Sequence, residues 1–139
     1  ILRFYDEHSA LVGRYRLLHS ITKTFPTAIA GTMLYPEAPD FADTLAGSPL
    51  FGYYLLEGLM QLAGFHGGIT RPEQIRLSVP VAIDCLSFYG PWQKGASYHL
   101  AANLQQQNDE DTIWSAVARD ASGAPVMELS GLIMRTLQG

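Results

Sequence analysis

The sequence predicts an α+β domain in which an antiparallel sheet wraps around one long, buried helix. The helix is indicated by the apolar run at residues 49–64, which is too long for a typical strand and too short to cross a bilayer. Strand-like segments flank this run, and those after it are joined by hairpin-type turns, so the sheet is antiparallel there. A helix this apolar must bury its side chains, and one face of the sheet can cover them.

Local patterns predict the elements on the N-terminal side of the long helix. We expect a short helix, two strands and a loop, at residues 2–12, 14–24, 27–35 and 36–48. Gly13 stops the short helix, and Pro26 separates the two strands. Polar and apolar residues roughly alternate in the first strand, and the second is rich in β-branched and small residues. The loop segment contains Pro, Asp and Gly and has no periodicity. Gly67 and Gly68 predict the end of the long helix.

Four further strands are expected after the helix. They are residues 74–82 with a continuation toward Tyr89, then 97–104, 112–119 and 126–136. Residues 107–111 and 120–123 are good hairpin connections because Asn, Asp and Gly accept tight-turn backbone conformations. There is no internal repeat, low-complexity tract or linker, so residues 1–139 form one domain.

Composition excludes several classes of function. The net charge is −4, the pI is about 5.4 and no run of Lys or Arg occurs, so nucleic acid and anionic membranes are poor partners. Only 16% of residues are charged, which suggests that a partner covers part of the surface. The single cysteine, Cys85, excludes a disulfide framework and a thiolate metal site. No signal peptide or membrane span is visible, which favours a cytoplasmic location.

One carboxylate interrupts the apolar run. At helical spacing Glu57 and Gln61 lie on one face, about one turn apart. A carboxylate flanked by Leu56 and Leu59 loses water on folding and must find hydrogen-bond donors. Glu57 is therefore the best candidate for a working acid or base, with Gln61 as a partner. The alternative is a purely structural pair, and the spacing leaves both interpretations open.

The four histidines offer no obvious site. His8 lies in the polar first segment and is expected in solvent, and His99 is expected to face solvent from a strand. His19 fits a structural role on the first strand better than catalysis, whereas His66 lies near the helix end without a predicted direction. No pair has metal-ligand spacing, so no metal is predicted.

Two stretches resemble a known family. Residues 49–64 resemble the central helix of the hot-dog-fold (3R)-hydroxyacyl-carrier-protein dehydratases, in which a Pro-Gly pair leads into a helix bearing Glu-x-x-x-Gln. Residues 118–135 resemble the second hot-dog half of the dehydratase domains of polyketide synthases and polyunsaturated fatty acid synthases. The resemblance covers residues 14–136 and implies a single hot-dog domain, either self-contained or the C-terminal half of a double hot-dog. A start at Ile1 without methionine fits a separated half.

The resemblance also implies roles for individual residues. Glu57 would protonate the departing 3-hydroxyl of a 3-hydroxyacyl thioester, and Gln61 would orient it. The Gly52 amide at the helix N-terminus would polarise the thioester carbonyl, with Phe51 and Tyr53 beside it in the substrate-binding region. Phe51 stands where the family has proline. The implied activity is a lyase of fatty acid or polyketide biosynthesis that uses no cofactor, because the phosphopantetheine of an acyl carrier protein carries the substrate.

The chain departs from the family at the catalytic base. These dehydratases use a histidine about 14 residues before the acid, and this chain has Asp43 there, with no histidine between His19 and His66. The resemblance thus implies a histidine from another hot-dog half, reached through a homodimer or a pseudo-dimer joined at the sheet edges. Two alternatives are a non-catalytic module for acyl binding or dimerisation, and a hot-dog thioesterase.

Overall fold

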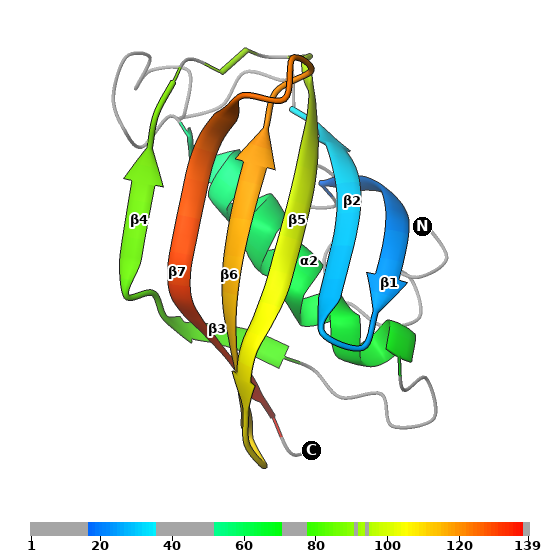
Figure 1. Cartoon of the computed structure of the whole chain (residues 1–139), viewed down its shortest axis with the longest axis vertical. Helices are drawn as coiled ribbons and strands as arrows, with labels where there is room; N and C mark the ends of the chain where they lie inside the picture. The colour runs from blue at the N-terminus through cyan, green and yellow to red at the C-terminus, as the bar shows by residue number, and fades with distance from the viewer. Residues whose placement is uncertain (1–16, 36–51, 71–77, 91, 94, 138–139) are drawn as a thin grey trace.

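The computed structural model describes residues 17–35, 52–70, 78–90, 92, 93 and 95–137, apart from the side chains of residues 68–70. Within these ranges one antiparallel sheet curves around one α-helix, so the α+β prediction is confirmed (Figure 1). The elements are β1 (Leu18–Phe25), β2 (Ala28–Leu34), α2 (Tyr53–Thr70), β3 (Ser78–Ala82), β4 (Cys85–Phe88), β5 (Ser97–Gln107), β6 (Asp111–Arg119) and β7 (Pro125–Thr136).

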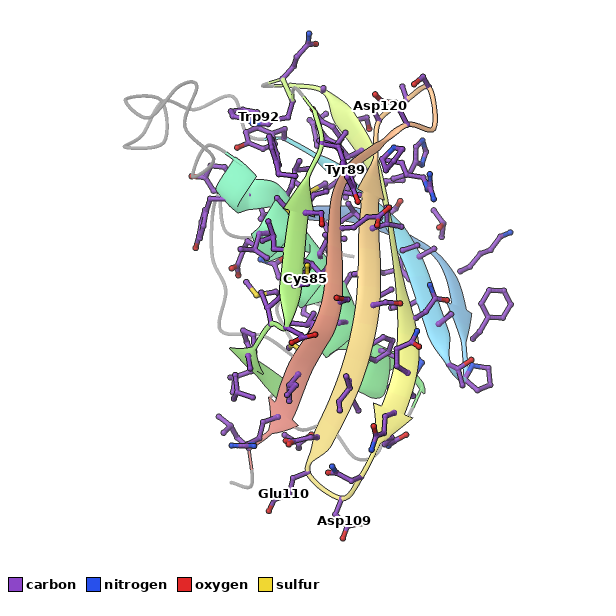
Figure 2. All side chains as sticks on the ribbon, turned by 60° about the vertical axis from the view of Figure 1, so that its left-hand side comes forward. Cys85, Tyr89, Trp92, Asp109, Glu110 and Asp120 are labelled. Atoms are coloured by element: carbon purple, nitrogen blue, oxygen red, sulfur yellow. The ribbon has the colours of Figure 1, made fainter. Side chains whose placement is uncertain are left out.

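The sheet order brings distant parts of the chain together. Strands run in the order β1-β2-β5-β6-β7, and β3 and β4 pair with successive parts of β7 to form the last edge. The two expected hairpins are confirmed, since β5 pairs with β6 and β6 with β7. In Figure 2 Asp109 and Glu110 mark the β5–β6 turn at one end of the sheet, and Asp120 marks the β6–β7 turn at the other.

The core lies between α2 and the face of the sheet that α2 covers. Alternate residues of β5 are buried, as expected when every second side chain of a strand points to one face. From the helix, Leu55, Leu59 and Leu62 are completely buried against this face. Burying each such side chain contributes about 1.5–3 kcal/mol, so the apolar run is the main source of stability for the helix.

The helix does not end where the glycines predicted. It continues through Gly67 and Gly68 to Thr70 because its last turns are attached to the sheet. His66 is buried, its Nε2 lies 2.7 Å from the carbonyl oxygen of Phe25, and its ring contacts the Trp114 ring edge-on. These tertiary contacts outweigh the loss of about 1 kcal/mol per glycine in a helix. The predicted short helix at 2–12 and loop at 36–48 lie outside the described residues.

The strand expected to continue toward Tyr89 is broken into β3 and β4. At the break the Asp84 amide donates to the carbonyl oxygens of both Ser130 and Gly131. Gly131 has a φ of 64°, and a Cβ there would overlap Asp84. The close approach of these two segments turns the edge of the sheet, which separates β4 from β3.

Two glycines of α2 predict opposite responses to alanine. A Cβ at Gly58 would lie 2.7 Å from Sδ of the fully buried Met33, whereas a Cβ at Gly67 meets nothing within 4 Å. We expect Gly58→Ala to lower the free energy of unfolding by about 1–3 kcal/mol through overpacking. Gly67→Ala should raise it by about 0.5–1 kcal/mol, because alanine has less conformational freedom to lose. Urea denaturation measures both, and equal effects would contradict this packing.

Candidate active site

Glu57 and Gln61 lie one turn apart on α2 and face each other. The Gln61 side-chain amide donates to Oε1 of Glu57 over 3.4 Å, and Gln61 is only 6% exposed. Glu57 itself is half-buried, because its position on the helix lies beside the leucines that face the sheet. A carboxylate at the border of the core is partly withdrawn from water, and part of it stays accessible to solvent. The catalytic role of the pair stays a prediction.

Gly52 stands at the start of the helix, where an added side chain would crowd two side chains of the sheet. A Cβ at this position would lie 2.9 Å from Cε2 of Phe88 and 3.2 Å from Cε of Met127. The absence of a side chain therefore lets the first turn of α2 approach β4 and β7. This turn contains no acidic residue, so its positive dipole end is not neutralised from within. Tyr53 follows Gly52 and is 36% exposed, one turn before Glu57; Phe51 lies outside the described residues.

A cluster of aromatic rings adjoins this first turn. The Tyr35 ring stacks on Trp92 at a centroid distance of 4.5 Å and meets Tyr54 edge-on at 5.5 Å and Tyr98 at 6.4 Å. Burial raises the pKa of the Tyr98 phenol, and its neutral hydroxyl accepts the backbone N–H of Gln93. The sequence showed these residues as separate aromatics; only the pairing of β2 with β5 brings Tyr35 and Tyr98 together.

The described histidines do not approach Glu57. His66 lies nine positions further along α2, about 13 Å along the helix axis, and is bonded to β1. His99 is exposed between the buried Tyr98 and Leu100, so it projects from the face of the sheet opposite the helix, as predicted. His19 is exposed on β1. A histidine base for Glu57 therefore has no source among residues 17–35, 52–70, 78–90, 92, 93 and 95–137.

A polar pocket lies at the other end of the helix. It has a volume of about 140 Å³ and is formed between the last turns of α2 and the β5–β6 turn. His66, Trp114 and Asp111 contribute to its lining, and Glu57 does not. Across the described part of the chain, no three His, Cys, Asp or Glu side chains are grouped to hold a metal ion.

The outer edge of β3 and β4 is apolar and exposed. Its large hydrophobic side chains are Val81, Leu86, Phe88 and Tyr89, with exposed fractions between 37% and 56%. We call these four residues the β4 edge. Figure 2 turns it toward the viewer, with Cys85 on β4 and Tyr89 just beyond its end. An exposed apolar strand edge favours pairing with another strand.

The family follows from a comparison with known proteins. Residues 3–139 match the model of the polyketide synthase dehydratase N-terminal domain, so the chain belongs to this family. The resemblance to hot-dog dehydratases is thereby confirmed. The matching model describes an N-terminal domain, whereas residues 118–135 resemble a second half, so the place of this domain in a double hot-dog stays a prediction. No curated protein is significantly similar in sequence.

Solved structures confirm the hot-dog fold. The dehydratase heterocomplex ApeI:P from Xenorhabdus doucetiae is 14% identical, with a TM-score of 0.74 over 92% of this chain and 87% of that chain. The putative thioesterase yhdA from Lactococcus lactis is 12% identical, with a TM-score of 0.61 over 80% and 79%. The protein smu.793 from Streptococcus mutans, bound to acetyl CoA, is 9% identical, with a TM-score of 0.66 over 94% and 97%.

Among the residues described, no helical segment combines the length and the hydropathy that a transmembrane span requires.

The close fit of Gly52 against β4 predicts coupling between two substitutions. Gly52→Ala should lower the free energy of unfolding by about 1–3 kcal/mol, because its Cβ strikes the Phe88 ring. In the Phe88→Ala background the same change should cost less, giving an interaction energy of about 0.5–3 kcal/mol in a double-mutant cycle. Gly90→Ala, where a Cβ meets nothing within 4 Å, is the matched control. Additive effects would show that Gly52 does not touch β4.

Proposed function

We propose that this domain takes part in the dehydration of a 3-hydroxyacyl thioester during polyketide or fatty acid synthesis, with Glu57 as the acid. The observation that supports this most strongly is the half-buried Glu57 beside the Gln61 amide, in a chain that belongs to a dehydratase family. The substrate would arrive on the phosphopantetheine arm of an acyl carrier protein. The reaction needs no cofactor, since the thioester itself acidifies the C2 proton.

The proposed mechanism assigns one task to each group. A base removes the proton from C2, and the electron pair is stabilised as enolate-like charge on the thioester oxygen near the Gly52 amide. Protonated Glu57 then donates its proton to the 3-hydroxyl as the C3–O bond breaks. Water leaves, and the double bond forms between C2 and C3. Gln61 keeps the carboxyl group of Glu57 pointed at the departing oxygen.

The base is proposed to come from a second hot-dog half. This inference rests on the positions of His19, His66 and His99, all of which lie away from Glu57. The β4 edge offers a place for such a half to pair, because it is apolar and no described strand occupies its free side. The ApeI:P structure is described as a dehydratase heterocomplex, which supports an arrangement of two different halves.

A thioesterase is the second candidate function. It is favoured by the structural likeness to a hypothetical thioesterase with coenzyme A from Streptococcus pneumoniae and to smu.793 bound to acetyl CoA. Hydrolysis would release a free acid and a thiol, whereas dehydration leaves the thioester intact. A thiol reagent added to the reaction therefore separates the two activities. A domain that binds the acyl chain and forms neither product would be a non-catalytic module.

The acid role of Glu57 predicts a selective loss of turnover. In the complex with its partner half, Glu57→Gln should lower kcat for water elimination by about 10²–10⁴-fold, because glutamine cannot donate the proton that the 3-hydroxyl needs. KM and the thermal unfolding temperature should stay unchanged. The matched control is Glu110→Gln, since Glu110 is exposed in the β5–β6 turn, away from both Glu57 and the β4 edge. Mass spectrometry of the acyl thioester measures the loss of water, and full activity of Glu57→Gln would exclude this role.

Pairing through the β4 edge predicts a position-dependent effect of charge. Leu86→Lys should weaken association with a second copy or a separate hot-dog half by about ten- to hundredfold, since about 1.5–3 kcal/mol of leucine burial is lost. Phe25→Lys, at the exposed end of β1 on the opposite edge, should leave association unchanged. Sedimentation velocity over a concentration series measures both. Dissociation caused by Phe25→Lys alone would place the interface on β1 instead.

A further inference from the structure

Two sets of contacts hold the first turn of α2. On one side Gly52 lies against the Phe88 ring and Met127, so closely that a Cβ would collide with the ring. Two residues later the buried Tyr54 meets the edge of the Tyr35 ring at a centroid distance of 5.5 Å. Gly52 thus lies close against the sheet, and Tyr54 adds a second contact two residues further along the helix.

Trp92 forms the outer layer of the second contact. Its ring stacks on Tyr35 at 4.5 Å with an interplanar angle of 25°, so Tyr35 lies between Trp92 and Tyr54. Trp92 is half-buried and packs on the edge of the core. In Figure 2 it lies at the end of the molecule where α2 begins. The three rings thus connect the segment between β4 and β5 with the start of the helix.

The segment that carries Trp92 is itself fixed. The Gln93 amide donates to the Tyr98 hydroxyl over 2.8 Å, and the Gly95 amide donates to the Tyr35 carbonyl over 2.9 Å. The Tyr35 amide donates in return to the carbonyl of Ala96 over 2.9 Å. These bonds tie the segment to β2 and β5 directly behind the aromatic rings. These bonds hold the segment of Trp92 in a defined position, in which the Trp92 ring packs on Tyr35.

We propose that Trp92 is a positioning residue, which fixes the Gly52 amide through Tyr35 and Tyr54 in the place where it meets the substrate carbonyl. This inference rests on the proposed function of Gly52 as a donor to that carbonyl. A donor stabilises developing charge well only when it is already in place before the reaction. A shift of about 1 Å can reduce the rate about a hundredfold. In this role Trp92 acts on the Gly52 amide through Tyr35 and Tyr54, and not on the substrate itself.

The experiment compares three variants in the complete protein with its partner half. Trp92→Leu removes the stacked ring and keeps an apolar side chain, whereas Trp92→Phe keeps an aromatic ring. Phe25→Leu is the control, because Phe25 is exposed on β1 at the opposite edge of the sheet, away from the β4 edge. Two quantities are measured, the NMR order parameter of the Gly52 amide and the kcat and KM for water elimination.

We expect Trp92→Leu to lower the order parameter of the Gly52 amide from about 0.85 to below about 0.6, the change from a rigid to a flexible backbone. Its kcat should fall about ten- to a hundredfold with KM unchanged, because only transition-state stabilisation is lost. Trp92→Phe and Phe25→Leu should keep wild-type values of both quantities. A purely structural role of Trp92 would lower stability and leave the Gly52 amide rigid.

The outcomes separate this inference from the proposed function. A rigid Gly52 amide in folded Trp92→Leu overturns the positioning role, whatever the activity. A flexible Gly52 amide combined with an unchanged kcat overturns it as well, because the turn would then not matter for the reaction. If no variant and no wild-type complex eliminates water, while Gly52 still loosens only in Trp92→Leu, then positioning of the turn is supported and the dehydratase function is wrong.

Discussion

The burial of one face of α2 against the concave face of the sheet is the constraint on which the rest of this domain depends. Leu55, Leu59 and Leu62 lie at helical spacing and are fully buried, so they fix the rotation of the helix about its axis. The rotation of the helix determines where the side chain of Glu57 lies. It must lie at the border of the core, where the Gln61 amide reaches it.

The same packing defines where the helix begins in space. Because Gly52 has no side chain, the first turn fits closely against β4 and β7, and the helix dipole points from there along its axis. Glu57, the proposed acid, and the helix N-terminus are thus separated by little more than one turn of the helix. A substrate that spans this distance could present its carbonyl to one and its 3-hydroxyl to the other, which is the geometry that elimination of water requires.

The sequence was sufficient for the features that depend on local pattern. The buried helix followed from an unbroken apolar run, and the β5–β6–β7 hairpins followed from alternation and turn residues such as Asn108 and Gly123. The predicted end of the helix was wrong. The contact of His66 with Phe25 joins residues 41 positions apart, and it outweighs the local effect of Gly67. The aromatic cluster around Tyr35 was not predicted either, because it depends on which strands become neighbours in the sheet.

The sequence can predict catalytic groups only where they lie in this chain. A carboxylate in an apolar run stands out from its neighbours, so the sequence alone was enough to propose Glu57. The base that we propose comes from another half, so the only sign of it in this sequence is that no histidine lies between His19 and His66. The β4 edge fits the proposed second half, because it exposes apolar side chains such as Leu86 and no described strand pairs with its outer side.

The most direct measurement is a crystal structure of the complex with a non-reactive amide analogue of a 3-hydroxyacyl pantetheine thioester. We predict the 3-hydroxyl oxygen within about 3 Å of a Glu57 carboxyl oxygen, at hydrogen-bond distance, with the carbonyl oxygen directed at the Gly52 amide. An analogue bound away from the first two turns of α2, for instance in the polar pocket beside His66, would contradict the assignment of Glu57 as the acid.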